Sequence, residues 1–319
     1  MNLKSIKLNG RYHIDGEHLY FYNVGSGFSF KMNGQSFSVL LKAIPEPGYY
    51  YIIVDRDYKN KTKILTAQSP YIYEFKNSGE HIVDIVKANE SNDNALEFDG
   101  LEVNGELLEF DHCYSGAVKV FGDSTIAGFG ILSHESPASI ENSDGVCDFC
   151  YHALYELDNE MDILCASGYG LAFSSYTNPK TIGIYDFHNK VAVHKDISWE
   201  DDSKYDLLII SLGCNDNSFI QECTNKEERI DEFRLKYRKL IDSQLEHNKG
   251  LKILMVYGTL KEESAYYLCE ETYNYLKPFY KNLFIHRFNG DNSAISNHAY
   301  VSAHEEMSKE LKKVIKEII

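Results

Sequence analysis

The feature of this sequence that most constrains its fold is a change of pattern near residue 115. Before it, short runs rich in aromatic and β-branched residues are separated by turn signals such as Asn33-Gly34 and Asn77-Ser78-Gly79. After it, apolar strand-like runs alternate with segments of helical spacing. Closely spaced strands favour a β-sandwich or jelly roll, and the alternation favours a parallel sheet with helices on both faces. We therefore expect a jelly-roll-like β-sandwich over residues 1–110 and an α/β domain over residues 111–319.

The alternating half predicts where a functional site should lie. In open parallel sheets, ligands bind beyond the carboxyl ends of the strands. We therefore expect the polar loops after residues 121, 166, 211 and 288 to meet at one edge of the sheet. The expected strands are 117–121, 161–166, 206–211, 252–258 and 282–288, and the expected helices are 145–159, 226–248, 262–280 and 302–318.

A serine follows the first of these strands. Gly122-Asp123-Ser124 comes directly after an apolar run, so a sharp turn would lift the Ser124 hydroxyl clear of the sheet. Serine becomes a good nucleophile only when a base takes its proton and nearby donors hold the oxyanion that forms. The same three residues also suit an ordinary turn, with the aspartate as a helix cap. The assignment of Ser124 as nucleophile therefore depends on the other loops.

Two further strand ends offer oxyanion donors. Gly168 follows the second strand and can present a backbone N–H, and Asn215 follows the third and can present a side-chain amide. With the Ser124 N–H they would form an oxyanion hole of three donors. Either residue alone is also explained by a glycine turn or by an asparagine that caps the next helix.

The general base is expected among the last histidines. His298 falls in the loop between the last strand and the last helix, which places it at the same edge as Ser124. His304 falls inside the predicted helix, where a structural role is expected. We therefore interpret His298 as the base.

Taken together, these residues resemble the blocks of the SGNH (GDSL-type) hydrolase superfamily. Gly122-Asp123-Ser124, Gly168, Gly213-Cys214-Asn215-Asp216 and His298 occur in the superfamily's order. A β-sandwich ahead of such a domain is similar to carbohydrate esterase family 2, and the segment from His81 to Glu90 looks like that family's junction strand. The resemblance implies a three-layer α/β/α hydrolase domain and the removal of acetyl groups from O-acetylated sugars.

The sequence departs from the superfamily in its closing pattern, where Ala299 and Ala303 replace a proline and a glycine, and in the acid of the triad. The acid of a catalytic triad should precede His298 by two or three residues, where this chain has Ser296 and Ile295, and Asp291 lies seven residues before it. The resemblance to the esterase family implies a Ser-His dyad in which a backbone carbonyl orients the histidine. A carbonyl can fix the imidazole tautomer without supplying a charge.

Composition narrows the range of partners. Asp and Glu number 48 against 32 Lys and Arg, which gives a formal net charge of -16 with no basic cluster, so a nucleic-acid partner is not expected. No apolar run approaches the ~18 residues of a membrane span. Trp199, and Tyr169 with the loop after it, are possible stacking surfaces for a sugar ring, although a tryptophan in the core is equally consistent with the sequence.

The combined prediction is a serine esterase that removes O-acetyl groups from carbohydrates through an acetyl-enzyme. No metal or other cofactor is expected, because the lone Cys147/Cys150 pair is not accompanied by a second pair or a histidine cluster. The N-terminal residues lack the apolar core of a signal peptide, which favours a cytoplasmic location. The alternatives are a sugar O-acetyltransferase that uses the same site and a carbohydrate-binding protein with a weakened site.

Overall fold

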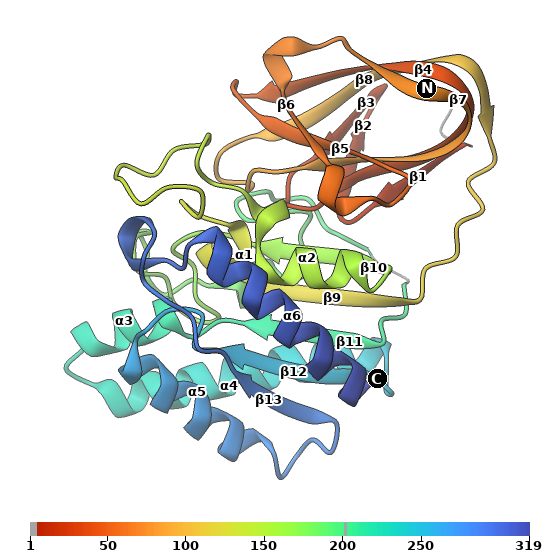
Figure 1. The fold of residues 1–319 in the computed structure, drawn as a ribbon. Helices are drawn as coiled ribbons and strands as arrows, with labels where there is room; N and C mark the ends of the chain where they lie inside the picture. The colour runs from red at the N-terminus through yellow and green to blue at the C-terminus, as the bar shows by residue number, and fades with distance from the viewer. Residues whose placement is uncertain (1–4, 201–202) are drawn as a thin grey trace.

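The computed structural model describes residues 5–200 and 203–319 and contains two sheets (Figure 1). The first is antiparallel, has eight strands and is followed by the second, which is parallel and has five. The last strand of the first sheet ends at Leu108, and the first strand of the second begins at Gly116. The fold class predicted from the sequence is confirmed. No helix in the described ranges is long and apolar enough to cross a membrane.

The N-terminal sheet curls around its own apolar core (Figure 1). Its strand order is β2-β3-β8-β4-β7-β5-β6, with β1 added beside β4. Between β5 and β7 lie β6 and two short 3-10 helices, Tyr58–Asn60 and Thr66–Gln68. The strands are β1 (Ile6–Asn9), β2 (Tyr12–Asp15), β3 (His18–Phe21), β4 (Gly27–Ile44), β5 (Tyr49–Val54), β6 (Thr62–Leu65), β7 (Tyr71–Lys87) and β8 (Ala95–Leu108).

Strand β4 shows how the sequence pattern builds this core. Side chains alternate between the two faces of a strand, and the buried apolar residues before Gly34 are the even-numbered Phe28, Phe30 and Met32. The register shifts between Gly34 and Ser36, and the buried positions after it are odd-numbered. A β-bulge inserts one residue, so it keeps both halves of the strand facing the same core.

The second sheet has the order β10-β9-β11-β12-β13 and helices on both faces. Helices α2 and α6 cover one face, whereas α3, α4 and α5 cover the other (Figure 1). Its strands are β9 (Gly116–Gly122), β10 (Asn159–Cys165), β11 (Leu207–Ser211), β12 (Lys252–Tyr257) and β13 (Leu283–Arg287), and its helices are α1 (Ser124–Ala127), α2 (Phe149–Glu156), α3 (Cys214–Glu222), α4 (Lys226–His247), α5 (Glu263–Leu276) and α6 (Val301–Ile318).

The helices that differ most from the sequence prediction are α2 and α3, and α5 ends at Leu276 where 280 was expected. The segment expected as one helix over 145–159 begins as a 3-10 turn, after which the Asp148 carboxylate accepts the N–H groups of Cys150 and Tyr151 and starts α2. Helix α3 was not predicted, because its first residues were interpreted as a polar loop. It begins directly after Gly213, whose φ of +133° is a conformation that glycine adopts readily and other residues rarely adopt.

The two domains share part of their apolar core. Tyr51 and Tyr58 of the N-terminal domain belong to the same buried cluster as Phe149 of α2. The buried Arg11 guanidinium forms two hydrogen bonds to the Asp162 carboxylate, at 2.7 and 3.2 Å. The N-terminal sheet therefore packs against the side of the second domain that carries α2 and β10 (Figure 1).

Candidate active site

Ser124 lies at the point where β9 ends and α1 begins. Asp123 caps this short helix, because its Oδ1 accepts the Thr125 N–H at 3.0 Å and the Thr125 hydroxyl at 2.6 Å. A side chain at Gly122 would collide with Ile126, so the turn can be this tight only with glycine. The turn leaves the Ser124 hydroxyl at the wall of a pocket of about 720 Å³.

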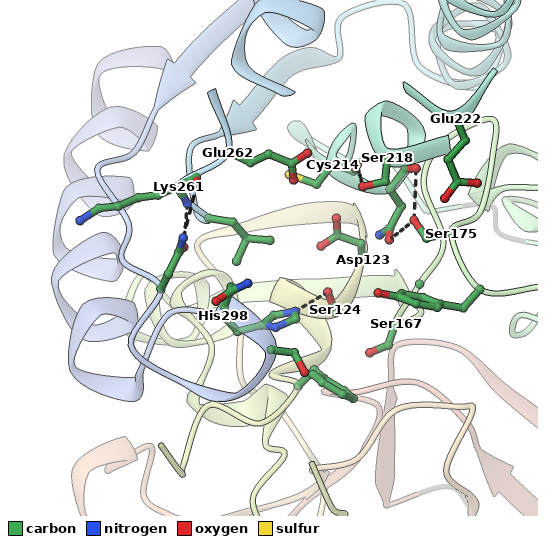
Figure 2. Close-up of a pocket in the computed structure, with 18 residues that line it drawn as sticks. Asp123, Ser124, Ser167, Ser175, Cys214, Ser218, Glu222, Lys261, Glu262 and His298 are labelled. Atoms are coloured by element: carbon green, nitrogen blue, oxygen red, sulfur yellow. Dashed lines mark hydrogen bonds between the residues drawn. The ribbon is translucent and has the colours of Figure 1, made fainter. Parts of the chain in front are cut away.

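His298 lies opposite Ser124 in this pocket (Figure 2). Its Nε2 is 2.7 Å from the Ser124 Oγ, and its Nδ1 is 3.0 Å from the backbone oxygen of Ile295. A carbonyl can only accept, so Nδ1 carries the proton and Nε2 is left to accept the serine O–H. Ser296 and Asn297 both have positive φ, of 54° and 61°, and form the sharp turn that brings this carbonyl to the Nδ1 edge of the ring.

No carboxylate hydrogen-bonds to His298 in the described ranges of the chain. Asp291 instead accepts the N–H groups of Ser293 and Tyr300 within its own loop. Burial lowers the pKa of His298, and the negative charge of Asp123 opposes that shift. The imidazole is therefore held neutral, with Asp123 as the carboxylate that favours its protonated form from a distance.

The two other predicted donors line the same pocket. Gly168 has a φ of +82°, a conformation that favours glycine. The Asn215 Oδ1 accepts the Ser175 hydroxyl at 2.9 Å and its Nδ2 donates to the Tyr169 carbonyl at 3.3 Å, which leaves a second N–H on this nitrogen. The structure thus brings together the four residues that the sequence singled out at separate strand ends.

Asp216 supports this side of the pocket, a role that the sequence analysis did not assign. Its carboxylate is fully buried and accepts the backbone N–H groups of Leu171, Ala172 and Phe173 at 2.7–2.9 Å. Burial raises its pKa to about 6, although these three N–H groups favour the charged form. Asp216 therefore fixes the loop after Gly168 to the start of α3.

The two aromatic residues expected as substrate contacts do not line this pocket. Tyr169 is buried in the core and its hydroxyl pairs with His194, because the chain turns inward directly after Gly168. Trp199 packs edge-on against Tyr12 beside a different pocket. The loop after Tyr169 does reach the active-site pocket, since its Tyr176 lines the wall and is 87% exposed.

Most of the residues that line the rest of the pocket carry polar groups (Figure 2). These side chains can donate hydrogen bonds to hydroxyl groups or accept hydrogen bonds from them. The charged residues of the lining are Asp123, Glu222 and Glu262 and one lysine, Lys261. The apolar part includes Phe129, whose ring lies 5.1 Å from that of His298. The polar residues away from the Ser124–His298 contact include Ser218, Glu222, Lys261, Glu262, Asn292 and Asn297.

His304 has a structural setting, as expected. It is fully buried in α6, and its Nδ1 accepts the Phe149 N–H at 3.2 Å. Burial lowers its pKa to about 3, so the ring is neutral at ordinary pH. Within residues 5–200 and 203–319 no group of three or more His, Cys, Asp or Glu side chains is arranged to hold a metal ion.

Comparison with known proteins agrees with this architecture. Residues 8–110 match the family Carbohydrate esterase 2 N-terminal. No curated protein matches the chain in sequence. Among solved structures, a family two carbohydrate esterase from Cellvibrio japonicus is 22% identical with a TM-score of 0.82, covering 99% of this chain and 95% of that one.

Two further structures match over the whole chain. A family two carbohydrate esterase from Clostridium thermocellum, in complex with cellohexaose, is 20% identical with a TM-score of 0.83 and covers 98% of both chains. An acetyl xylan esterase from Butyrivibrio proteoclasticus is 16% identical with a TM-score of 0.82 and covers 99% of this chain and 96% of that one. This chain thus has an N-terminal domain of the carbohydrate esterase 2 type and, over its whole length, the fold of the family 2 carbohydrate esterases.

Proposed function

We propose that this protein is a serine esterase that removes O-acetyl groups from carbohydrates through a Ser-His dyad. The observation that carries the proposal is the 2.7 Å contact between Ser124 Oγ and His298 Nε2 in a pocket that Gly168 and Asn215 also line. A nucleophile, its base and oxyanion donors at one point make up the machinery of acyl transfer.

The reaction begins with proton transfer from Ser124 to His298. Because Nδ1 is held as a donor to Ile295, Nε2 takes the proton while Oγ attacks the carbonyl carbon of the ester. The negative charge that develops on the carbonyl oxygen is stabilised by the N–H groups of Ser124 and Gly168 and the Asn215 amide.

The tetrahedral intermediate then collapses. The His298 imidazolium donates its proton to the departing sugar oxygen, and the acyl group remains on Ser124 as an ester. Water attacks this acyl-enzyme by the same route, with His298 again as base, and releases acetate. The Asp123 carboxylate stabilises the imidazolium electrostatically in both half-reactions, since its charge opposes the lowering of the His298 pKa by burial.

The polar residues of the pocket wall and the exposed Tyr176 support a carbohydrate as the alcohol part of the ester. Sugar hydroxyls need both donors and acceptors, which Lys261, Glu262 and Asn292 provide, and a sugar ring can stack on an aromatic face. The likeness to enzymes that act on carbohydrates, one of them an acetyl xylan esterase, points to the same class of substrate.

The test is acetate release from a panel of acetylated mono- and oligosaccharides. Ser124→Ala and His298→Ala should each lower kcat by about 10⁴-fold or more, as loss of a nucleophile or its base does in serine hydrolases. Ser133→Ala, a serine outside the pocket, serves as the matched control. Full activity in either dyad variant would refute the assignment, and acetyl transfer to an added acceptor sugar would show that the enzyme favours transfer over hydrolysis.

A further inference from the structure

The loop between β7 and β8 carries a carboxylate from the N-terminal domain to the edge of the active site. Glu90 lies in this loop, is 6% exposed, and its Oε2 accepts the backbone N–H of Ser167 at 2.7 Å. Ser167 directly precedes Gly168 and lines the pocket. Figure 2 shows Ser167 beside Ser124, on the side where ribbons of the N-terminal domain enter the view.

A second contact constrains the peptide group between Ser167 and Gly168. The Asn92 Nδ2 donates to Glu90 Oε2 at 3.2 Å and reaches the Ser167 carbonyl at 3.5 Å. A trans peptide group is planar, and its C=O and N–H point in opposite directions. With the Ser167 carbonyl turned toward Asn92, the N–H of Gly168, a residue that lines the pocket, points away from Asn92.

The loop that carries Glu90 is itself firmly held. Lys87 is fully buried, and its Nζ donates to the carbonyls of Asn89 and Glu90. The Asn89 side chain accepts the Tyr49 N–H at 2.8 Å and donates to the Ser143 carbonyl of the second domain. A buried amine that donates to two successive carbonyls fixes the turn, so the position of the Glu90 carboxylate is set before substrate binds.

We propose that Glu90 is a positioning residue, through which the N-terminal domain sets the direction of the Gly168 N–H. The Glu90–Ser167 contact is short, at 2.7 Å, which makes it the main constraint on Ser167, with the 3.5 Å contact of Asn92 as the weaker second one. This inference rests on the proposed function, because it treats the Gly168 N–H as an oxyanion donor. It makes the N-terminal domain a part of the catalytic apparatus as well as a packing partner.

Backbone hydrogen exchange tests the positioning without using activity. In Glu90→Ala, the Ser167 amide loses its acceptor, so exchange in the segment 165–172 should become at least about tenfold faster at unchanged overall fold. Tyr58→Phe is the matched control, since the Tyr58 hydroxyl makes a different hydrogen bond between the domains, to the Val146 carbonyl at 2.7 Å. Its exchange in 165–172 should match the unaltered chain.

Kinetics with p-nitrophenyl acetate test the consequence for catalysis. An oxyanion donor acts in the transition state, so Glu90→Ala should lower kcat by about tenfold or more with KM unchanged, below the 10²–10³-fold of a donor lost outright. Burial raises the pKa of Glu90 to about 7, and a glutamine oxygen can still accept the Ser167 N–H. The kcat of Glu90→Gln should therefore stay within about threefold of that of the unaltered enzyme. Asn92→Ala, an exposed position, should lower kcat by about threefold and tests the proposal even if Glu90→Ala does not fold.

The two measurements separate the inference from the proposed function. Faster exchange in Glu90→Ala, with no esterase activity even in the unaltered chain, would support the positioning and refute the esterase. Unchanged exchange, a rise in KM at constant kcat, an equal loss in Glu90→Gln, or an equal loss in Tyr58→Phe would each overturn the positioning role while an active unaltered enzyme upheld the esterase.

Discussion

The active-site pocket has a base side, which carries His298, and an oxyanion side, which carries Gly168 and Asn215. The residues that hold the base side in place are near in sequence, whereas those that hold the oxyanion side are distant. On the base side, His298 is oriented by the carbonyl of Ile295, three residues away, and Asp291 caps the same loop. On the oxyanion side, Asp216 binds backbone groups 43 to 45 residues away, and Glu90 binds one 77 residues away. A single imidazole can be oriented by a carbonyl of its own loop. The oxyanion donors follow different strands, so the backbone that carries them is held by carboxylates from elsewhere in the fold.

The largest effect expected from the difference between the two sides of the pocket is on the stability of the fold. Asp216→Ala should lower the free energy of unfolding by about 3–5 kcal/mol, because it leaves three buried backbone N–H groups without an acceptor. The counterpart on the base side, Asp291→Ala, should cost about 1 kcal/mol, since its contacts lie within an exposed loop. Urea unfolding of both variants checks this, and equal losses would break the contrast.

The next effect is on catalysis. Asn215→Ala removes one oxyanion donor and should lower kcat by about 10²–10³-fold, equivalent to about 2.7–4 kcal/mol, with little change in KM. Ser175→Ala removes only the hydroxyl that orients the Asn215 amide, so it should lower kcat by about threefold. Steady-state kinetics on an acetylated sugar distinguish the two, and comparable losses would show that orientation matters as much as the donor itself.

The smallest expected effect is a shift in the pH dependence of activity, which His298 on the base side sets. The base must be neutral, and burial lowers the pKa of His298, so activity should fall with decreasing pH only below the ordinary histidine value of about 6.5. Asp123→Asn removes the negative charge that opposes this shift, so the acidic limb of kcat/KM should move further down. A limb above pH 6.5, or an upward shift in Asp123→Asn, would contradict this account of the site.

Much of the site could be predicted because its reacting residues stand at strand ends. Ser124, Gly168, Asn215 and His298 each follow an apolar run, and the segments after parallel strands gather at one edge of the sheet. The absence of an acid two or three residues before His298 was also visible in the sequence. The catalytic roles of these residues remain predictions for the experiments above.

The supporting residues could not be predicted, since their partners are distant in sequence. Nothing local distinguishes Glu90 from an ordinary loop carboxylate, and its contact with Ser167 exists only because the two domains pack together. Tyr169 and Tyr176 are both tyrosines of one loop, yet one is buried in the core and the other is exposed at the pocket. The direction of a loop side chain depends on the path of the backbone, which residue type and spacing do not specify.

The sequence by itself therefore determined the two-domain organisation, the alternation of strands and helices, and the set of groups that could meet at one edge. Periodicity and turn residues encode these features locally, so they can be inferred before any contact is known. The tertiary structure decided the 2.7 Å contact between Ser124 and His298, the Ile295 carbonyl as its orienting partner, and the attachment of the oxyanion side to Asp216 and Glu90. These depend on distances between segments far apart in the chain, which only packing fixes.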